Sequence, residues 1–146
     1  MEIRLAIPDD VPAMHAIRLR VRENRLSDPS VVTEPDYLAF MARDTRSWVC
    51  TCDDGTIAGF TMVDVENRNL WALFVAPEHE GKGVGRALHE AMCAWYFTRA
   101  IALRLSTASD TRAEAFYRKA GYRPDGHTPS GERIFELRPT KGAAKD

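Results

Sequence analysis

The sequence lacks a charge bias, a long apolar run and a signal-peptide pattern. Its 20 lysines and arginines oppose 21 aspartates and glutamates, for a formal net charge of -1. This balance gives no electrostatic support to a nucleic-acid surface or an anionic-membrane patch. No apolar run approaches the roughly 18 residues of a membrane span, and Met1 to Arg4 lack the apolar core of a signal peptide. We expect a cytoplasmic protein that binds neither nucleic acid nor membrane.

Cysteine is scarce, and its spacing suits neither a disulfide nor a metal site. Cys50 and Cys52 lie two apart in a strand pattern, where their side chains point alongside one another in poor disulfide geometry. Cys93 lies on a helix pattern, and there is no Cys-x-x-Cys pair. The histidines show no ligand spacing either, so no metal is expected. Structural cysteines are favoured, and a Cys-His nucleophilic pair assembled by folding is left open.

Strand and helix patterns begin the chain. Residues 3–7 alternate apolar and polar side chains and predict a strand, and a turn then leads to a helix that begins at Asp9 or Asp10. The apolar face of this helix consists of Val11, Met14, Ile17 and Val21, and the cationic remainder consists of Arg18, Arg20, Arg22 and Arg25. A solvated charged surface is the simpler interpretation of these arginines. The alternative is that Arg22 or Arg25 helps to frame a pocket for an anionic substrate.

A second, shorter helix is predicted to end near residues 43–44. Thr33 and Pro35 provide the polar cap and early proline of its first turn, and its apolar side consists of Tyr37, Leu38 and Met41. Connecting segments of this kind vary without disturbing a scaffold, so ligand specificity is expected here.

Three consecutive antiparallel strands are predicted in the middle of the chain. Residues 48–52 and 56–63 flank Asp53-Asp54-Gly55, which is a strong hairpin signal. A turn at 66–69 leads to 70–75, which is nearly continuously apolar, as expected for a central strand covered on both faces.

The last third predicts two helices separated by a strand and followed by further strands. Leu88, Ala91, Met92 and Trp95 recur at helical spacing and predict a helix over 86–98. A strand is expected over 101–106, then a helix that opens at Asp110 and is closed by Gly121 at its C′ position. Tyr122 and 133–137 supply final strands around a loop at 126–131. The chain therefore predicts one mixed α/β domain over 1–138 and a C-terminal tail at 139–146.

Glycines are concentrated at one point, directly after the central strand. Gly81, Gly83 and Gly85 follow the strand that ends at Val75, and a helical pattern opens at Arg86. Glycine lets the backbone approach a ligand closely, and the first N–H groups of a helix have no intrahelical partner. The stretch therefore predicts an anion site, with phosphate favoured. A glycine-rich turn without a ligand is the simpler alternative.

Spacing excludes two common phosphate loops. A Walker loop requires a serine or threonine after its lysine, but Lys82 is followed by Gly83. A dinucleotide fingerprint requires a third glycine, but counting from Gly83 that position is Leu88, and counting from Gly81 it is Arg86. Nucleotide hydrolysis and dinucleotide binding are both disfavoured.

Two motifs resemble those of the GNAT N-acetyltransferase superfamily. Glu80-Gly81-Lys82-Gly83-Val84-Gly85 is similar to its [Gln/Arg]-x-x-Gly-x-[Gly/Ala] loop, except that Glu80 replaces the first residue. The stretch from Asp110 through Ala113 and Tyr117 to Gly121-Tyr122 is similar to Asn-x-x-Ala-x-x-x-Tyr-x-x-x-Gly-Phe, with Asp110 for asparagine and Tyr122 for phenylalanine. The order of elements also fits over nearly the whole chain, with residues 20–47 matching no motif.

The resemblance implies a fold, a reaction and a set of residues. The fold is a mixed, mostly antiparallel sheet of six or seven strands flanked by about four helices. The reaction is transfer of an acetyl group from acetyl-coenzyme A to the primary amine of a small molecule or peptide, by direct attack in a ternary complex. Tyr117 is implied as the acid that protonates the leaving thiolate, and a phenol suits that role. The implied cofactor residues are Phe74, Val75, Glu80, Gly81, Lys82, Gly83, Val84, Gly85, Arg86, Asp110, Arg112 and Tyr117.

The general base and the acceptor pocket are less defined. Some members place a glutamate on the central strand, where this chain has Asn69, so deprotonation would pass through water to Glu66, Asp64 or another group, or the amine would arrive neutral. Glu66 is our first candidate. Acceptor-pocket candidates are Arg22, Arg25, Tyr37, Asn69 and Trp71. A homodimer is also expected, since dimers are common in the family.

Two other functions are compatible with the sequence. Glu80, Asp110 and the absent strand glutamate favour a non-catalytic acyl-coenzyme A binding or regulatory module on the same fold. A nucleotide-binding interaction protein would use the glycine loop for another phosphate ligand.

Overall fold

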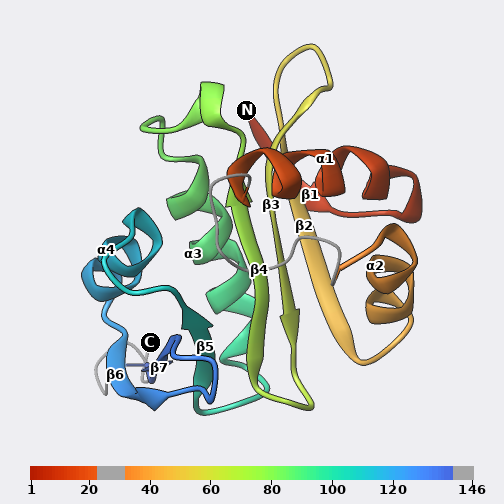
Figure 1. Ribbon diagram of the computed structural model, residues 1–146. Coiled ribbons are helices and arrows are strands. Elements are labelled where there is room, and N and C mark those ends of the chain that lie inside the picture. The colour runs from red at the N-terminus through yellow and green to blue at the C-terminus, as the bar shows by residue number, and fades with distance from the viewer. Residues whose placement is uncertain (23–31, 140–146) are drawn as a thin grey trace.

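The computed structural model describes residues 1–22 and 32–139, and a seven-stranded sheet runs through them in the order β1-β2-β3-β4-β5-β7-β6 (Figure 1). The strands are β1 (Glu2–Leu5), β2 (Thr45–Thr51), β3 (Ile57–Asp64), β4 (Asn69–Val75), β5 (Leu103–Thr107), β6 (Arg123–His127) and β7 (Arg133–Leu137). Neighbouring strands are antiparallel except for β4 and β5, which are parallel. The predicted mixed, mostly antiparallel sheet is confirmed.

Helices cover both faces of this sheet (Figure 1). They are α1 (Val11–Arg22), α2 (Glu34–Met41), α3 (Val84–Tyr96) and α4 (Arg112–Lys119), with short 3-10 helices at η1 (Pro8–Asp10) and η3 (Pro77–His79). One core lies under α1 and α2 and includes Met14, Tyr37, Phe60 and Met62. The other lies under α3 and α4 and includes Leu88, Met92, Tyr117 and Phe135. The sheet is therefore buried on both faces, as the apolar pattern of 70–75 predicts.

A bulge in β4 changes which side chains face α1. Val63 pairs with Leu70 and Met62 pairs with Ala72, so Trp71 has no partner on β3. Trp71 and Ala72 consequently both pack in the α1 core, whereas alternation along a regular strand would send them to opposite faces.

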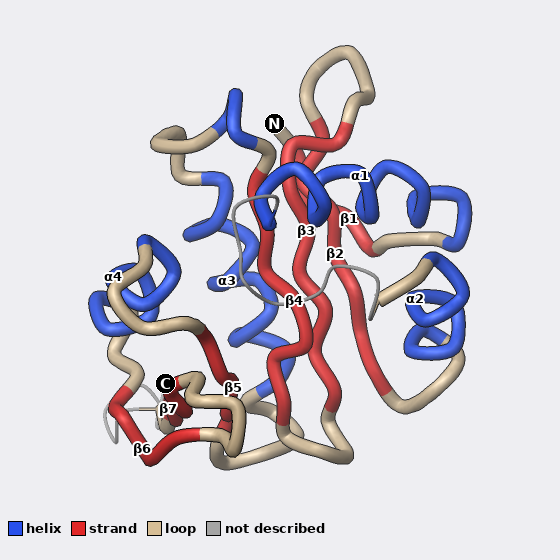
Figure 2. Tube along the Cα trace, viewed as in Figure 1, coloured by secondary structure: helices blue, strands red, loops and turns tan. Residues whose placement is uncertain are grey.

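The strands β4 and β5 meet only at their first residues. Their single paired position joins Asn69 to Arg104, and β4 then continues past the end of β5 toward the glycine loop (Figure 2). Among the described residues, no strand therefore lies beside the edge of β4 that faces away from β3 beyond Asn69. A ligand can add main-chain hydrogen bonds to such an edge.

Several element boundaries differ from the predicted ones. The helix expected at 86–98 begins earlier, at Val84, because the left-handed Gly83 serves as its N-cap. The strand expected from residue 101 begins at Leu103, and Ile101 is exposed, because the chain is still turning after α3. The loop expected at 126–131 begins only at residue 128, because β6 pairs with β7 as far as His127.

Two side-chain assignments in the first two helices were also wrong. Leu38 was expected on the apolar side of α2 but is 46% exposed, because the aromatic pair Tyr37 and Phe40, three residues apart, faces the sheet instead. Arg18 was grouped with the solvated cations of α1 but lies half-buried against aromatic rings. The start predicted at Asp9 or Asp10 is a 3-10 turn, and α1 itself begins at Val11.

Some predictions fall outside the described residues. The side chain of Arg22, the whole of Arg25 and all but the first residue of the predicted tail at 139–146 belong to this group. Within residues 1–22 and 32–139, no helix is long and apolar enough to cross a membrane.

Candidate active site

The glycine loop is built by backbone conformations that favour glycine. Gly81 and Gly83 have φ values of 77° and 82°, in the left-handed region that L side chains rarely adopt, and a side chain added at either would meet no atom within 4 Å. The loop therefore has open space beside its backbone. The first intrahelical bond of α3 runs from the Ala87 N–H to the Gly83 carbonyl, so the amides of Val84, Gly85 and Arg86 have no intrahelical acceptor.

A glycine that the sequence reasoning overlooked places this helix end against the sheet. A Cβ atom on Gly59 of β3 would lie 2.8 Å from the Phe74 carbonyl oxygen and 3.0 Å from the Val84 side chain. Only glycine allows β4 and the first turn of α3 to approach so closely. An isolated glycine inside a strand pattern is a sequence signal for such an approach.

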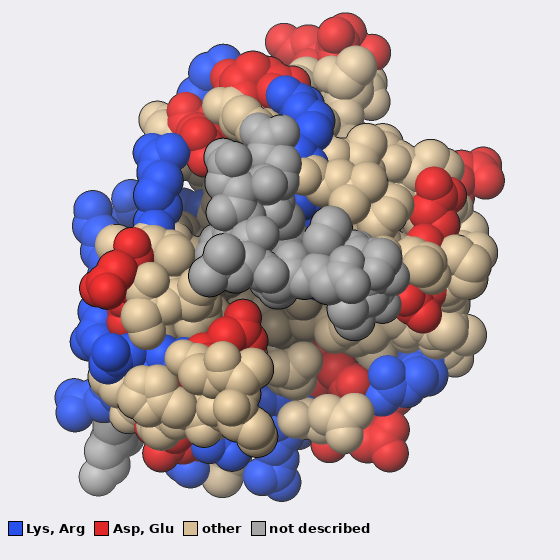
Figure 3. Space-filling model, in the orientation of Figure 1, with Lys and Arg blue, Asp and Glu red and all other residues tan. Residues whose placement is uncertain are grey.

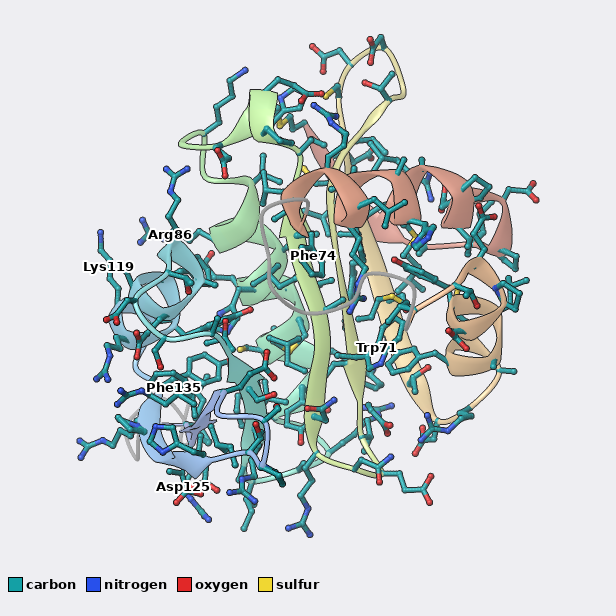
Figure 4. The ribbon with its side chains drawn as sticks, viewed as in Figure 1. Trp71, Phe74, Arg86, Lys119, Asp125 and Phe135 are labelled. Carbon is teal, nitrogen blue, oxygen red and sulfur yellow. The ribbon has the colours of Figure 1, made fainter. Side chains whose placement is uncertain are left out.

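Cations surround the loop. Figure 3 shows lysine and arginine side chains along the edge of the molecule where Figure 1 places the glycine loop and α4. Arg86 from α3 and Lys119 from α4 extend outward on that side (Figure 4). Free amides at a helix N-terminus, open left-handed glycines and nearby cations together fit a pyrophosphate group.

The loop is tied to α4 by an ion pair between the two sequence motifs. Arg112 Nη1 donates to Glu80 Oε1 at 2.9 Å, and both side chains are solvent-accessible. Glu80 is the residue that departs from the family pattern, and this contact gives its carboxylate a cationic partner. Phosphates at the loop would thus face a neutralised pair instead of an isolated negative charge.

The predicted acid Tyr117 lies on α4 and is buried. Its ring packs against Phe116 and Tyr122 at centroid distances of 5.4 and 5.2 Å. Phe116 lies beside the glycine loop, 3.8 Å from the position of a Cβ on Gly85. The start of α4 is capped by Thr111, whose hydroxyl accepts from the Glu114 N–H, while Asp110 adopts a left-handed φ of 60° before it. The helix predicted to open at Asp110 therefore begins two residues later.

A polar cluster on α3 contacts Tyr122, which in turn packs against Tyr117. His89 Nε2 lies 2.8 Å from the Tyr122 hydroxyl, and Cys93 Sγ lies 3.6 Å from the same histidine nitrogen. Burial lowers the pKa of His89 and raises the pKa of the Cys93 thiol to about 12. Cys-His contacts of the kind that the sequence left open thus occur twice among the described residues, here and between Cys52 Sγ and His79 Nε2 at 3.5 Å. The raised pKa of Cys93 disfavours its thiolate, which is the nucleophilic form, at neutral pH.

The carboxylates considered as bases lie at the opposite end of β4 from the glycine loop. Glu66 is 72% exposed and approaches Arg43 at 3.8 Å. Asp64 is buried, and its pKa is lowered because hydrogen bonds from Asn67 and Arg43 outweigh the effect of burial. Asn69 is half-buried at the start of β4, where it pairs with Arg104.

Aromatic side chains cover β4 on the α1 face. Tyr37 and Phe40 of α2 contact Trp71 at centroid distances of 5.3 and 4.8 Å, and Phe60 contacts Phe74 at 5.6 Å. Figure 4 shows Trp71 and Phe74 along the same strand. Two acceptor-pocket candidates are therefore in direct contact, Tyr37 on α2 and Trp71 on β4.

Arg18 is the residue of this region that sequence reasoning assigned wrongly. Its guanidinium carbon lies 4.9 Å from the centroid of the Trp71 ring and 5.0 Å from that of Phe74. The signal was present in the sequence, because Arg18 follows Met14 by four residues and precedes Val21 by three, which places it on the apolar face of α1.

The fold and this geometry define a class of protein, one that binds an elongated ligand along an opened sheet. A sheet opened between two parallel strands, with a phosphate-type loop where the central strand ends, suits an elongated ligand that carries a pyrophosphate.

Comparisons with known proteins give this class its family. The Acetyltransferase (GNAT) family matches residues 11–122. The structure resembles a PaiA N-acetyltransferase from Thermoplasma acidophilum in complex with coenzyme A, with a TM-score of 0.78, 19% identity, and coverage of 94% of this chain and 98% of that chain. No curated protein matches the sequence. The chain belongs to the GNAT family of acetyltransferases.

Two further structures share the fold. The ribosomal-protein-S18-alanine N-acetyltransferase from Escherichia coli has a TM-score of 0.73 at 21% identity, with 94% of this chain and 92% of that chain covered. The ribosomal-protein-alanine N-acetyltransferase from Brucella melitensis has a TM-score of 0.79 at 18% identity, with 94% and 99% covered.

Proposed function

We propose that the protein is an acetyl-coenzyme A-dependent N-acetyltransferase whose acceptor is the primary amine of a small molecule or peptide, and that residues 1–138 form its single domain. The observation that carries this proposal is the junction of β4 and α3. There an unpaired strand edge leads directly into a loop with left-handed glycines and free helix-end amides. Strand edge and loop match the two parts of coenzyme A that must be held, an amide-containing arm and a pyrophosphate.

Each end of the site has a distinct binding task in this proposal. The main chain of Phe74 and Val75 would hydrogen-bond the amide arm of the ligand, and the amides from Gly81 to Arg86 would bind its phosphates. Lys82, Arg112 and Arg86 add positive charge on that side. When bound, acetyl-coenzyme A would supply an activated acetyl group to an attacking amine.

Tyr117 is the proposed acid. A phenol can donate its proton as negative charge develops on a departing thiol. The contacts with Phe116 and Tyr122 restrict the ring, so the hydroxyl is held in place before reaction.

Deprotonation of the amine is proposed to pass through water to Glu66, or to be unnecessary because the amine arrives neutral. The exposure of Glu66 and its approach to Arg43 favour a proton relay over direct contact with the amine. Positioning the two reactants together supplies much of the rate enhancement in such a reaction.

The relatives' names support amines as acceptors without identifying one for this chain. Two of the similar structures are named as acetyltransferases of a ribosomal-protein alanine. We propose a small-molecule or peptide amine as the acceptor of this chain. That the protein forms a homodimer and lies in the cytoplasm remains a prediction from the sequence.

A thiol-release assay tests this function. The purified chain would be incubated with acetyl-coenzyme A and a panel of amino acids, polyamines, aminoglycosides and peptide N-termini, with free thiol and acetylated product measured together. Turnover with at least one amine supports the enzyme. Tight coenzyme A binding with no turnover across the panel would instead favour the non-catalytic module.

A further inference from the structure

Arg18 occupies a position that α1 otherwise gives to apolar residues. Val11 and Met14 are nearly fully buried on this face, and Val21 continues it at helical spacing. A cation in such a stripe loses hydration and requires a compensating partner. The position of Arg18 therefore calls for an explanation that the solvated arginines of the helix do not need.

Contacts with the described residues replace only part of the hydration that the Arg18 guanidinium loses. The guanidinium lies over the faces of Trp71 and Phe74, which attract a cation. Its Nη1 atom is nevertheless buried, and among the described residues it has no hydrogen-bond partner. Buried polar nitrogens are seldom left without a partner, so a ligand group that reaches this one would complete its hydrogen bonding.

Two other arginines have carboxylate partners. Arg4 bonds both carboxylate oxygens of Asp10, at 2.8 and 2.9 Å, and Arg43 bonds Asp64 at 2.8 Å. Arg18 has no acidic partner of this kind among residues 1–22 and 32–139. The described residues thus supply carboxylates to Arg4 and Arg43 and none to Arg18.

The position of the guanidinium connects it with the reaction site. Trp71 is the bulged residue of β4, and Phe74 lies near the end of that strand. Both belong to the strand whose unpaired edge would hold the acetyl donor. An anion on Nη1 would therefore lie beside β4, on the α1 face of the sheet.

We propose that Arg18 binds a carboxylate of the acceptor, so that the substrate is an amine that also carries a carboxylate, as an amino acid does. This inference rests on the proposed acetyltransferase function and names its substrate class. A planar guanidinium fixed against two rings is preorganised for a planar carboxylate. The phosphates of the donor have their own cations beside the glycine loop.

The first test measures selectivity during turnover. The wild-type chain is assayed with acetyl-coenzyme A and pairs of L-amino acids and their carboxamides, in which an amide replaces the carboxylate. Rates are expressed per neutral amine, because amidation also lowers the pKa of the α-amine. We expect kcat/KM to favour the carboxylate member by about 10- to 100-fold in at least one pair. Arg18→Gln should remove that preference while leaving the rate with the carboxamide nearly unchanged.

The second test measures binding and does not depend on turnover. The dissociation constants of N-acetyl-L-amino acids and their amides are measured by calorimetry in the presence of coenzyme A. We expect the carboxylate to bind wild type about tenfold more tightly or better, and Arg18→Gln to bind both members alike. Arg18→Lys, which keeps the charge but loses the planar fork, should retain only part of the preference.

A matched control separates recognition from packing. Arg99 also stacks its guanidinium on a tryptophan, Trp95 of α3, at 4.4 Å, but it does so under the opposite face of the sheet. Arg99→Gln should leave the carboxylate preference intact. If Arg18→Gln fails to fold, Arg18→Lys still reports the preference.

The outcomes distinguish this inference from the function on which it rests. Turnover without any carboxylate preference, or a preference that survives in Arg18→Gln, overturns the role of Arg18 and leaves the acetyltransferase in place. Carboxylate binding that depends on Arg18 without turnover of any amine supports the anion site and rejects the enzyme.

Discussion

The two faces of the sheet use different parts of the chain to prepare a site. On the α3 face, the phosphate-type site is made of backbone, through left-handed glycines and helix-end amides. On the α1 face, the site consists of side chains, namely the aromatic rings and the guanidinium of Arg18. The backbone contributes mainly the bulge at Trp71. The first arrangement requires particular residues at particular φ values. The second requires only that suitable side chains meet in space.

This contrast has a consequence for the evolution of specificity. A backbone site is expected to tolerate exchange of its non-glycine members, such as Glu80, because every residue offers the same main-chain amide. A side-chain site changes its ligand when one residue changes. We therefore expect the donor site to be general and the acceptor site to be particular to this chain, and the following predictions test that division.

The largest effect is expected from Tyr117→Phe, which removes the proposed acid and leaves the ring. Loss of general-acid assistance should slow acetyl transfer by about 100-fold or more, while coenzyme A affinity stays nearly unchanged. Steady-state rates and calorimetric binding would measure the two quantities. Unchanged turnover would remove the acid role and would leave the α3 face with a binding task alone.

Tyr122→Phe is the matched control for this substitution. Tyr122 lies one ring away, and its hydroxyl is engaged with His89 at 2.8 Å. Its removal should lower the free energy of unfolding by about 1 kcal/mol through the lost hydrogen bond. A selective loss of kcat comparable to that of Tyr117→Phe would show that the effect arises from packing.

The next effect is expected from Gly83→Val, which tests whether the α3 site is built of backbone. A β-branched residue is strained at the Gly83 φ of 82°, so the loop should rearrange and coenzyme A should bind roughly 10- to 100-fold more weakly. Gly55→Val is the control, since Gly55 has a φ of 89° and open space but lies at the tip of the β2–β3 hairpin. It should cost similar stability without changing the affinity, and equal affinities in folded Gly83→Val would contradict the phosphate site.

The same division explains how much could be predicted from the sequence. The hairpin at 48–64, the glycine loop and the closing Gly121 follow from local turn and cap chemistry, and all are present. The bulge at Trp71 could not be predicted, because it depends on the register between β3 and β4. The Glu80–Arg112 pair also joins distant positions, 32 residues apart in the chain.

The prediction for Arg18 was wrong for a different reason. Helical spacing alone places it on the apolar face, but grouping it with the other arginines by charge concealed that placement. A residue that departs from the pattern of its helix is thus the main local signal that a side-chain site leaves in a sequence. Motif patterns, in contrast, identify the backbone site.

A smaller effect is expected at Glu80, where a side chain modifies the backbone site. Glu80→Gln removes a negative charge beside the loop and releases Arg112, so coenzyme A should bind a few-fold more tightly at low salt. Arg112→Gln should weaken binding by a similar factor. Both changes should shrink in high salt because the groups are accessible to solvent. Weaker binding by Glu80→Gln would show that the carboxylate assists the ligand through another contact.

The smallest effect concerns stability, and it compares two histidine–tyrosine pairs, one on each face. His89 is buried beside Tyr122 under α3, whereas His15 of α1 is half-buried beside Tyr37 at 3.2 Å. Burial lowers the pKa of His89 below its ordinary 6.5, so the unfolded chain binds its proton at a higher pH than the folded chain does. Its contribution to stability is complete above about pH 6.5 and is lost as the pH falls toward the lowered value, with a slope of at most about 1.4 kcal/mol per pH unit.

Chemical denaturation between pH 7 and 5.5 would report this contribution with little from the carboxylates whose pKa values the fold lowers, since these titrate below that range. They are Asp10, Asp54, Asp64, Glu78 and Glu114. We expect the free energy of unfolding to decrease as the pH falls from 7 to 5.5 in wild type and in His15→Gln, and to vary less in His89→Gln. An equal pH dependence in wild type and His89→Gln would mean that the buried histidine does not control it. Since Tyr122 packs on Tyr117, a confirmed effect would also identify His89 as the group through which acid weakens the packing around the proposed catalytic tyrosine.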